Sequence, residues 1–236
     1  MYLAGMQKLS LVDYPDKVAC TLFTGGCNLR CPFCHNSELL TGPMPSIDVR
    51  EVWDYLDQRQ GILDAVVVSG GEPCMQPDLL SFLQQLKKRD LLIKLDTNGC
   101  YPEALREALA QGLVSYVAMD LKSDPEGYRA ASGCTDVPLA AIRESIELLM
   151  AGEIPFELRT TVVVPLHTEK NFLGMKDFLS PIVHKFLRKI PNYYLQSFKD
   201  RDTVPFAGFS APSRTQLEDY GRIMAEVASH VGLRGV

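Results

Sequence analysis

Several features are missing from this sequence of 236 residues. No apolar run reaches the roughly 20 residues that a membrane helix needs, and residues 1–11 include Lys8 and lack the apolar core of a signal peptide. Lys and Arg form no runs and the net charge is −5, so the chain offers no basic surface for nucleic acid. We therefore expect a cytoplasmic protein that binds neither membranes nor nucleic acid.

The seven cysteines are an odd number, which suits a disulfide framework poorly. Thiols stay reduced in the cytosol, where clustered cysteines more often bind metal or do chemistry. Three of the seven lie close together, in the segment Cys27–Cys34. The others form no second C-x-x-C motif and are expected to be buried free thiols: Cys20, Cys74, Cys100 and Cys134.

Short apolar segments rich in β-branched residues predict six strands that are buried on both faces, as in a parallel sheet. Helical patterns separate or follow them, and the alternation predicts an α/β fold. We expect one domain over residues 1–236, with a core of about 15–200 and a last helix at 213–231 packed on it. The predicted strands are Val18–Thr24, Ala65–Ser69, Leu91–Asp96, Val114–Asp120, Phe156–Val164 and Tyr193–Ser197. The other predicted helices cover residues 46–56, 77–86, 102–111 and 139–151, and a further one follows Thr168.

The cysteine segment follows the first predicted strand and two glycines. Cys27, Cys31 and Cys34 can hold three irons of a [4Fe–4S] cube and leave the fourth iron open to another ligand. A structural zinc site normally has four ligands, and His35 would strain to share one metal with the cysteine directly before it. The spacing therefore favours an iron–sulfur cluster over zinc.

With Phe33 before the last cysteine, the segment resembles the C-x-x-x-C-x-φ-C signature of the radical S-adenosylmethionine (SAM) superfamily, in which φ is aromatic. The resemblance implies a partial (β/α)6 barrel with parallel strands and outer helices. It implies two cofactors, a [4Fe–4S] cluster and SAM, with the three cysteines as ligands and catalytic residues. In that superfamily the open iron binds the amino and carboxylate groups of the methionine moiety. One electron from the reduced cluster then yields methionine and a 5′-deoxyadenosyl radical, which abstracts a hydrogen.

The second predicted strand ends in Ser69-Gly70-Gly71-Glu72-Pro73. The carboxyl ends of strands are where α/β folds bind ligands, and glycines there allow close backbone approach. Alone, this sequence is compatible with an ordinary tight turn. After the cysteine segment it resembles the GGEP element of the superfamily, which implies that Gly70, Gly71, Glu72 and Pro73 bind the amino group of SAM.

Acidic residues end the third and fourth predicted strands. Asp96, followed by Thr97 and Asn98, can accept both hydroxyls of a ribose, as acidic residues do in nucleotide folds. Asp120 and Lys122 could form only a structural ion pair. The DTNG sequence resembles that of glycyl-radical-enzyme activases, which implies Asp120 near the ribose and Lys122 at the SAM carboxylate. The same resemblance implies a monovalent cation between Asp96, Thr97 and Asp120.

The fifth strand carries Arg159, which needs an anionic partner in this apolar context. A cofactor carboxylate and a core Asp or Glu are the two alternatives. We expect Thr161 and Val163 to line the adenine, and Gln196 on the sixth strand to face the top of the barrel.

The segments Leu9–Pro15, His35–Asn36 and Met119–Lys122, with DTNG and the strand RTTVV, resemble the activating proteins of anaerobic ribonucleoside-triphosphate reductase. The resemblance implies a protein substrate that loses a glycine Cα hydrogen, and a low-potential electron donor such as flavodoxin. Asp13 could orient the substrate loop or could simply cap a turn.

Two alternatives remain open. One is a radical SAM enzyme acting on a small molecule, similar to 7-carboxy-7-deazaguanine synthase. The other is a non-catalytic iron–sulfur or zinc module, against which the polar strand ends argue. Three histidines have no partners at metal-ligand spacing and are expected at the surface or in caps: His167, His184 and His230.

Overall fold

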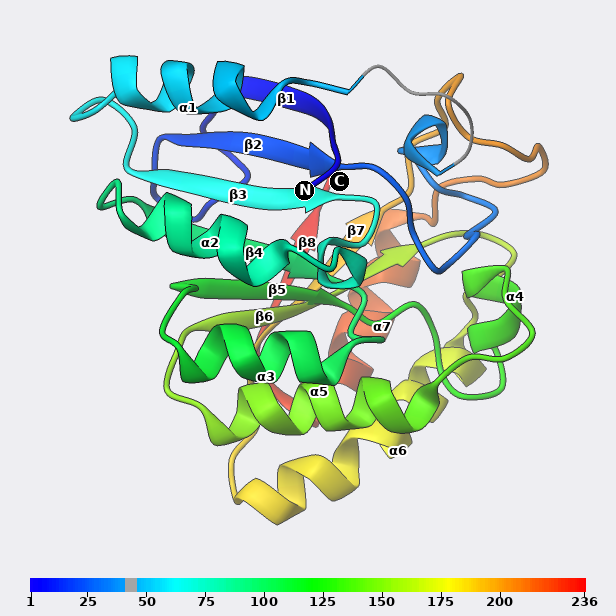
Figure 1. Ribbon diagram of the computed structural model, residues 1–236. Coiled ribbons are helices and arrows are strands. Elements are labelled where there is room, and N and C mark those ends of the chain that lie inside the picture. The colour runs from blue at the N-terminus through cyan, green and yellow to red at the C-terminus, as the bar shows by residue number, and fades with distance from the viewer. Residues whose placement is uncertain (41–45) are drawn as a thin grey trace.

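The computed structural model describes residues 1–40 and 46–236. In this part of the chain, eight strands form one curved sheet in sequence order (Figure 1). β1 (Leu3–Ser10) is antiparallel to β2 (Ala19–Thr24), and every later neighbour is parallel. The remaining strands are β3 (Ala65–Gly70), β4 (Leu92–Thr97), β5 (Tyr116–Asp120), β6 (Phe156–Val162), β7 (Ile190–Ser197) and β8 (Ala228–Arg234).

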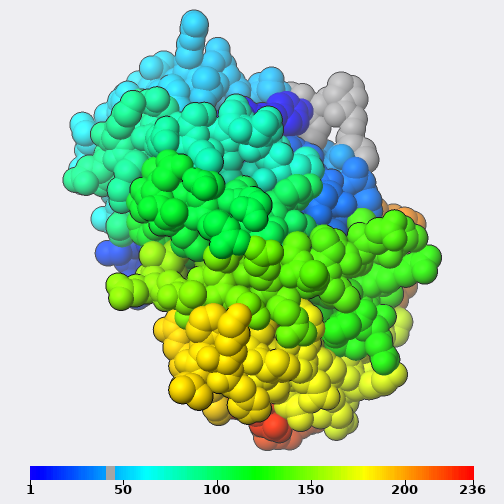
Figure 2. Space-filling model, turned by 60° about the horizontal axis from the view of Figure 1, so that its bottom comes forward, coloured from blue at the N-terminus to red at the C-terminus, as the bar shows by residue number. Residues whose placement is uncertain are grey.

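Helices cover the outer face of the sheet, and Figure 2 shows α2, α3, α5 and α6 in succession along one side. The predicted α/β barrel with outer helices is therefore confirmed. Within residues 1–40 and 46–236, no helix combines the length and apolarity needed to cross a membrane. The helices are α1 (Val49–Gln58), α2 (Leu79–Lys87), α3 (Pro102–Ala110), α4 (Tyr128–Ser132), α5 (Leu139–Ala151), α6 (Glu169–Phe186) and α7 (Arg214–Met224), with the 3-10 turns η1 (Ser37–Leu39) and η2 (Pro73–Met75).

The two faces of the strands differ in chemistry because successive side chains point to opposite sides. Outward residues such as Leu22 and Val68 join the large apolar core under the helices. On the inward face, Ala65 and Val67 belong to a small apolar cluster. Further along the strands the inward face carries charged residues, so the barrel interior becomes polar toward the carboxyl ends of the strands.

The chain departs from the predicted elements at both ends. β1 was not predicted, and the last helix, predicted over 213–231, ends at Met224 and is followed by β8. The apolar spacing of the helix continues through Val231, but pairing with β7 overrides it. Gly232 permits that pairing, since a Cβ there would lie 2.5 Å from Tyr194 Cε1.

Candidate functional site

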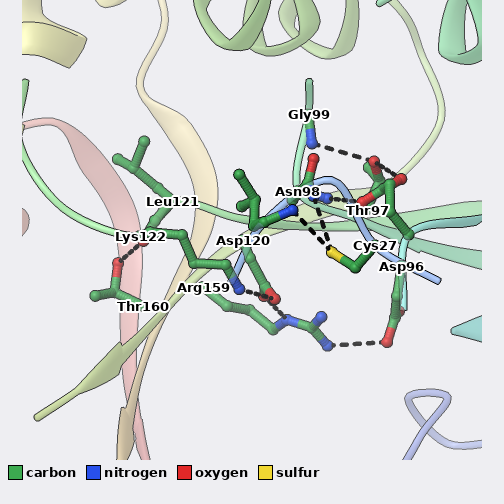
Figure 3. Close-up of polar contacts among 12 residues, drawn as sticks. Cys27, Asp96, Thr97, Asn98, Gly99, Asp120, Leu121, Lys122, Arg159 and Thr160 are labelled. Atoms are coloured by element: carbon green, nitrogen blue, oxygen red, sulfur yellow. Dashed lines mark hydrogen bonds and ion pairs between the residues drawn. The ribbon is translucent and has the colours of Figure 1, made fainter. Parts of the chain in front are cut away.

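A cavity opens at the carboxyl ends of the strands and is lined by Cys27, Cys31 and Cys34. None of the other four cysteines lines it. The structure therefore places the predicted ligand loop against the ends of several strands, as Figure 3 shows for Cys27. The strands and their following loops contribute Ser69, Gly70, Asp96, Asn98, Asp120, Lys122, Arg159, Thr161 and Gln196.

Two glycine turns pack backbone against backbone beneath the cysteine loop. The Gly71 amide donates to Thr24 O at 2.8 Å, and the Glu72 amide donates to Gly26 O at 2.9 Å. A Cβ on Gly71 would lie only 1.9 Å from Gly26 O. Glycine is therefore required there for close approach of the two turns, which fixes the ligand loop to the end of β3.

Further contacts hold the loop from its other sides. Asn98 Nδ2 donates to Asn28 Oδ1 at 2.8 Å and lies 3.8 Å from the Cys27 sulfur. On the outer side, a Cβ on Gly133 would lie 2.0 Å from Arg30 O, so the segment after α4 packs directly on the loop. The conformation of the ligand loop thus depends on residues distant in sequence.

Burial disfavours the charged form of the three thiols. It raises the pKa of Cys27 to about 11 and that of Cys31 to about 12, and it also raises the pKa of Cys34. The charge of Lys122 acts in the opposite direction on all three. Cationic iron would supply the charge that thiolates need here. Among the described residues, no group of three or more His, Cys, Asp or Glu side chains is arranged to hold one metal ion.

Asp96 and Asp120 anchor a cluster of charged side chains inside the barrel (Figure 3). Arg159 donates to both, from Nε to Asp120 Oδ1 at 2.8 Å and from Nη1 to Asp96 Oδ2 at 3.3 Å. Lys94 contacts Asp96 Oδ1 at 2.6 Å, and Lys122 contacts Asp120 Oδ2 at 2.9 Å. Burial opposes ionisation, but the nearby cations hold the pKa of both carboxyls below the usual range. The cluster carries one more cation than anions, which favours an anionic ligand.

The contacts within this cluster bear on two predictions made from the sequence, the role of Arg159 and the monovalent cation. Arg159 pairs with Asp96 and Asp120 and also lines the cavity, so its position is compatible with both alternatives, a core ion pair and a cofactor contact. Each oxygen of Asp96 and Asp120 accepts from a protein donor, so a monovalent cation here would share these carboxylates with those donors. The hydroxyl of Thr97, the third predicted ligand of the cation, donates instead to Glu72 at 2.8 Å.

Glu72 does not reach the cavity. Its buried carboxylate accepts from the amides of Cys74 and Asn98, at 2.9 and 2.7 Å, and from the Thr97 hydroxyl. Burial raises its pKa and these donors lower it. In place of the predicted contact with a cofactor amino group, the Glu72 carboxylate joins the turn after β3 to the end of β4. Other predicted contacts that do not line the cavity are Gly71, Pro73, Thr97 and Val163, whereas Phe33, Gly70, Asn98, Thr161 and Gln196 do.

The structure does not place Asp13 at the site. Its carboxylate accepts from the Thr21 hydroxyl at 2.6 Å, and its amide donates to Ser10 Oγ at 3.2 Å. It precedes the amino end of β2, whereas the cysteine loop follows the carboxyl end. Asp13 is a turn residue, the alternative to its predicted catalytic role.

Sequence reasoning missed several residues around the cavity. Ser69 donates to Asp96 at 2.9 Å, and His35 lines the cavity and stacks on Phe198. His167 was expected at the surface or in a cap; it is buried directly before Thr168, the first residue of the α6 cap, and burial lowers its pKa. Its Nδ1 accepts from the Val163 amide at 3.0 Å, so its Nε2 donates to Lys122 O at 2.7 Å. Two of these residues carried a sequence signal: His35 directly follows the cysteine motif, and Ser69 directly precedes the GGEP element.

Known proteins are similar to this chain over most of its length. Over 99% of its length the chain is 28% identical to a protein of Methanocaldococcus jannaschii assigned as a glycyl-radical enzyme activating enzyme, 96% of which is covered. It is 26% identical to the pyruvate formate-lyase-activating enzyme of Listeria monocytogenes, covering 85% of this chain and 79% of that one.

A solved structure shares the fold, with a TM-score of 0.55 and 21% identity. It is a domain of the pyruvate-formate lyase-activating enzyme of Bacteroides vulgatus, and the match covers 70% of this chain and 98% of that one. The relatives support the activase branch, whose cofactors are a [4Fe–4S] cluster and SAM. The family model of the radical SAM superfamily matches residues 21–179. This chain belongs to the radical SAM superfamily.

Proposed function

We propose that this protein is an activase that removes a hydrogen from a glycine Cα of a partner glycyl radical enzyme, the anaerobic ribonucleoside-triphosphate reductase. One observation carries the proposal. The three motif cysteines share a cavity with Gly70, Asp96 and Lys122 at the carboxyl ends of three strands. A cluster site directly beside polar groups suited to a nucleoside and an amino acid has no use in a plain binding module.

Each part of the cavity has a distinct task in this proposal. Cys27, Cys31 and Cys34 would hold the cluster, which together with SAM supplies a 5′-deoxyadenosyl radical. The surplus positive charge at Lys122 and Arg159 would orient the methionine carboxylate. Asp96 would accept from the ribose hydroxyls while Lys94 keeps it ionised. The buried walls would exclude water from the reactive radical.

Support for the reductase as target is the resemblance of Leu9–Pro15, DTNG and the strand RTTVV to its activating proteins. The Listeria relative favours a second target, pyruvate formate-lyase. Both are glycyl radical enzymes, so the chemistry is the same and only the docked protein differs. We further propose a cytoplasmic enzyme that receives electrons from a low-potential carrier such as flavodoxin.

The experiment mixes the anaerobically reconstituted protein, reduced with dithionite, and SAM with each candidate partner and records EPR spectra. The proposal expects a glycyl doublet with the reductase and 5′-deoxyadenosine as product. A doublet only with pyruvate formate-lyase would replace the target and keep the reaction. SAM cleavage without a glycyl signal on either protein would favour a small-molecule substrate.

A further inference from the structure

A second hollow lies on the outer side of the cysteine loop and shares no lining residue with the cavity. In Figure 1 the loop, α4 and the segment after β7 meet at the same side of the molecule. Arg30 and Pro32 come from the loop, Arg129 and Cys134 from α4 and its following segment, and Phe206 from the segment after β7. We call these five residues the loop-back surface.

The floor of this surface is the backbone that carries the cluster ligands. Arg30 donates to the carbonyls of Cys27 and Leu29. The Cys134 thiol donates to Asn28 O at 3.4 Å. Arg30 and Pro32 also flank Cys31 directly in the chain. A protein seated here would therefore be separated from the cluster by little more than the ligand loop.

The charge of the loop-back surface is opposite to that of the whole protein. The chain carries −5, yet Arg30 and Arg129 bring two positive charges to this hollow. Glu126 also lines it, but Lys170 pairs with its carboxylate at 2.8 Å. Complementary charge steers a partner and sets its orientation, so the surface suits an acidic protein.

An exposed aromatic side chain, Phe206, lines the same hollow as these charged residues. Phe206 is 61% exposed, although phenylalanine is usually buried. Aromatic and arginine side chains are enriched in protein interfaces, and a few such residues carry most of the binding energy. Phe206 beside two arginines is therefore the composition of a docking site.

We infer that the loop-back surface docks the electron donor, a small acidic one-electron carrier protein. The inference rests on the proposed function, in which each SAM cleavage consumes one electron. The donor is oxidised by one electron and the cluster is reduced by one. In the described chain the four remaining cysteines lie apart from the cavity and form no second C-x-x-C motif, so the inference takes the electron from a separate carrier protein. This surface leaves the cavity itself open to SAM and substrate.

The test measures binding of flavodoxin to the anaerobically reconstituted protein by calorimetry, at low and moderate salt. Arg129→Glu should weaken binding about tenfold at low salt and less at moderate salt, and Phe206→Ser should weaken it about tenfold. Glu126→Gln should tighten it. The matched control is Arg214→Glu, which makes the same charge change on α7, where the side chain is 77% exposed. It should change affinity less than twofold.

Affinities of Arg129→Glu and Phe206→Ser within twofold of the wild type would overturn the inference. So would weaker binding of the glycyl radical enzyme with unchanged binding of flavodoxin, because the surface would then dock the substrate. All variants should cleave SAM at the wild-type rate with dithionite as reductant. If chemically reduced wild-type protein fails to cleave SAM, the proposed function fails, and the flavodoxin affinities still decide the role of the surface.

Discussion

Arg159 joins two strand ends through the barrel interior, so replacing it is a sharp perturbation. Its guanidinium bridges Asp96 and Asp120, and its side chain is only 13% exposed. Arg159→Met keeps most of the aliphatic volume and removes the charge. The two carboxylates then each retain one lysine, Lys94 or Lys122, but repel each other without the bridging cation.

Removing one partner of a buried ion pair costs about 3–5 kcal/mol. The partners are mostly buried, so we expect a loss of about 3 kcal/mol in the free energy of unfolding at pH 7. The pKa of each aspartate is lowered in the folded state. Their stabilising effect is thus complete above the unfolded pKa of about 4 and declines as pH falls below it. The difference between variant and wild type should shrink over that acidic range.

Anaerobic urea unfolding followed by circular dichroism measures this difference at pH 7 and at a series of lower pH values. Lys185→Met is the control, because its pair with Glu147 lies at the surface, with the lysine side chain 58% exposed. It should cost no more than about 1 kcal/mol. Equal losses for the two variants, or a difference that grows as pH falls, would refute the reasoning.

Three further predictions concern separate parts of the molecule. Gly71→Ala places a Cβ against Gly26 O, so it should lower the iron content after reconstitution. It should also lower the free energy of unfolding by about 1–3 kcal/mol. Full iron content would contradict the packing argument. Arg234→Met leaves the carboxylate of Glu157, 1% exposed, without its cation, and because the arginine is 36% exposed we expect a discounted loss of about 2 kcal/mol by urea unfolding. No measurable loss would show that β8 holds its place beside β7 without this pair. Cys31→Ala should abolish SAM cleavage, measured as 5′-deoxyadenosine, with an unchanged far-ultraviolet dichroism spectrum; retained cleavage would refute the ligand assignment.

Most of the barrel follows from local sequence. Segments such as Ala65–Ser69, which holds three valines in a row, are mostly apolar and β-branched, and they become parallel strands of the sheet. The sequences of the two terminal strands, β1 and β8, do not show this pattern. The apolar spacing of α7 continues through Val231, but pairing with β7 and the ion pair of Arg234 with Glu157 hold residues 228–234 as a strand.

The sequence predicted the site residues that belong to a motif at the end of a strand. It did not predict which hydrogen-bond partners the side chains have. The cysteines, Asp96 and Lys122 line the cavity as expected. The carboxylate of Glu72 accepts from Thr97 and Asn98, which are distant in the sequence. The local sequence around Glu72 therefore could not predict these contacts. Asp13 is different, because a residue before the amino end of β2 lies at the end of the strand opposite the cysteine loop, and the predicted strand direction already implied this.

The central claim is that the three cysteines hold a cluster which SAM approaches directly. The most direct measurement is the iron and sulfide content of the anaerobically reconstituted protein, followed by EPR of the reduced protein with and without SAM. We predict about four irons for each chain and a reduced-cluster signal that changes when SAM is added. One zinc without iron, or a cluster signal that SAM leaves unchanged, would contradict the account.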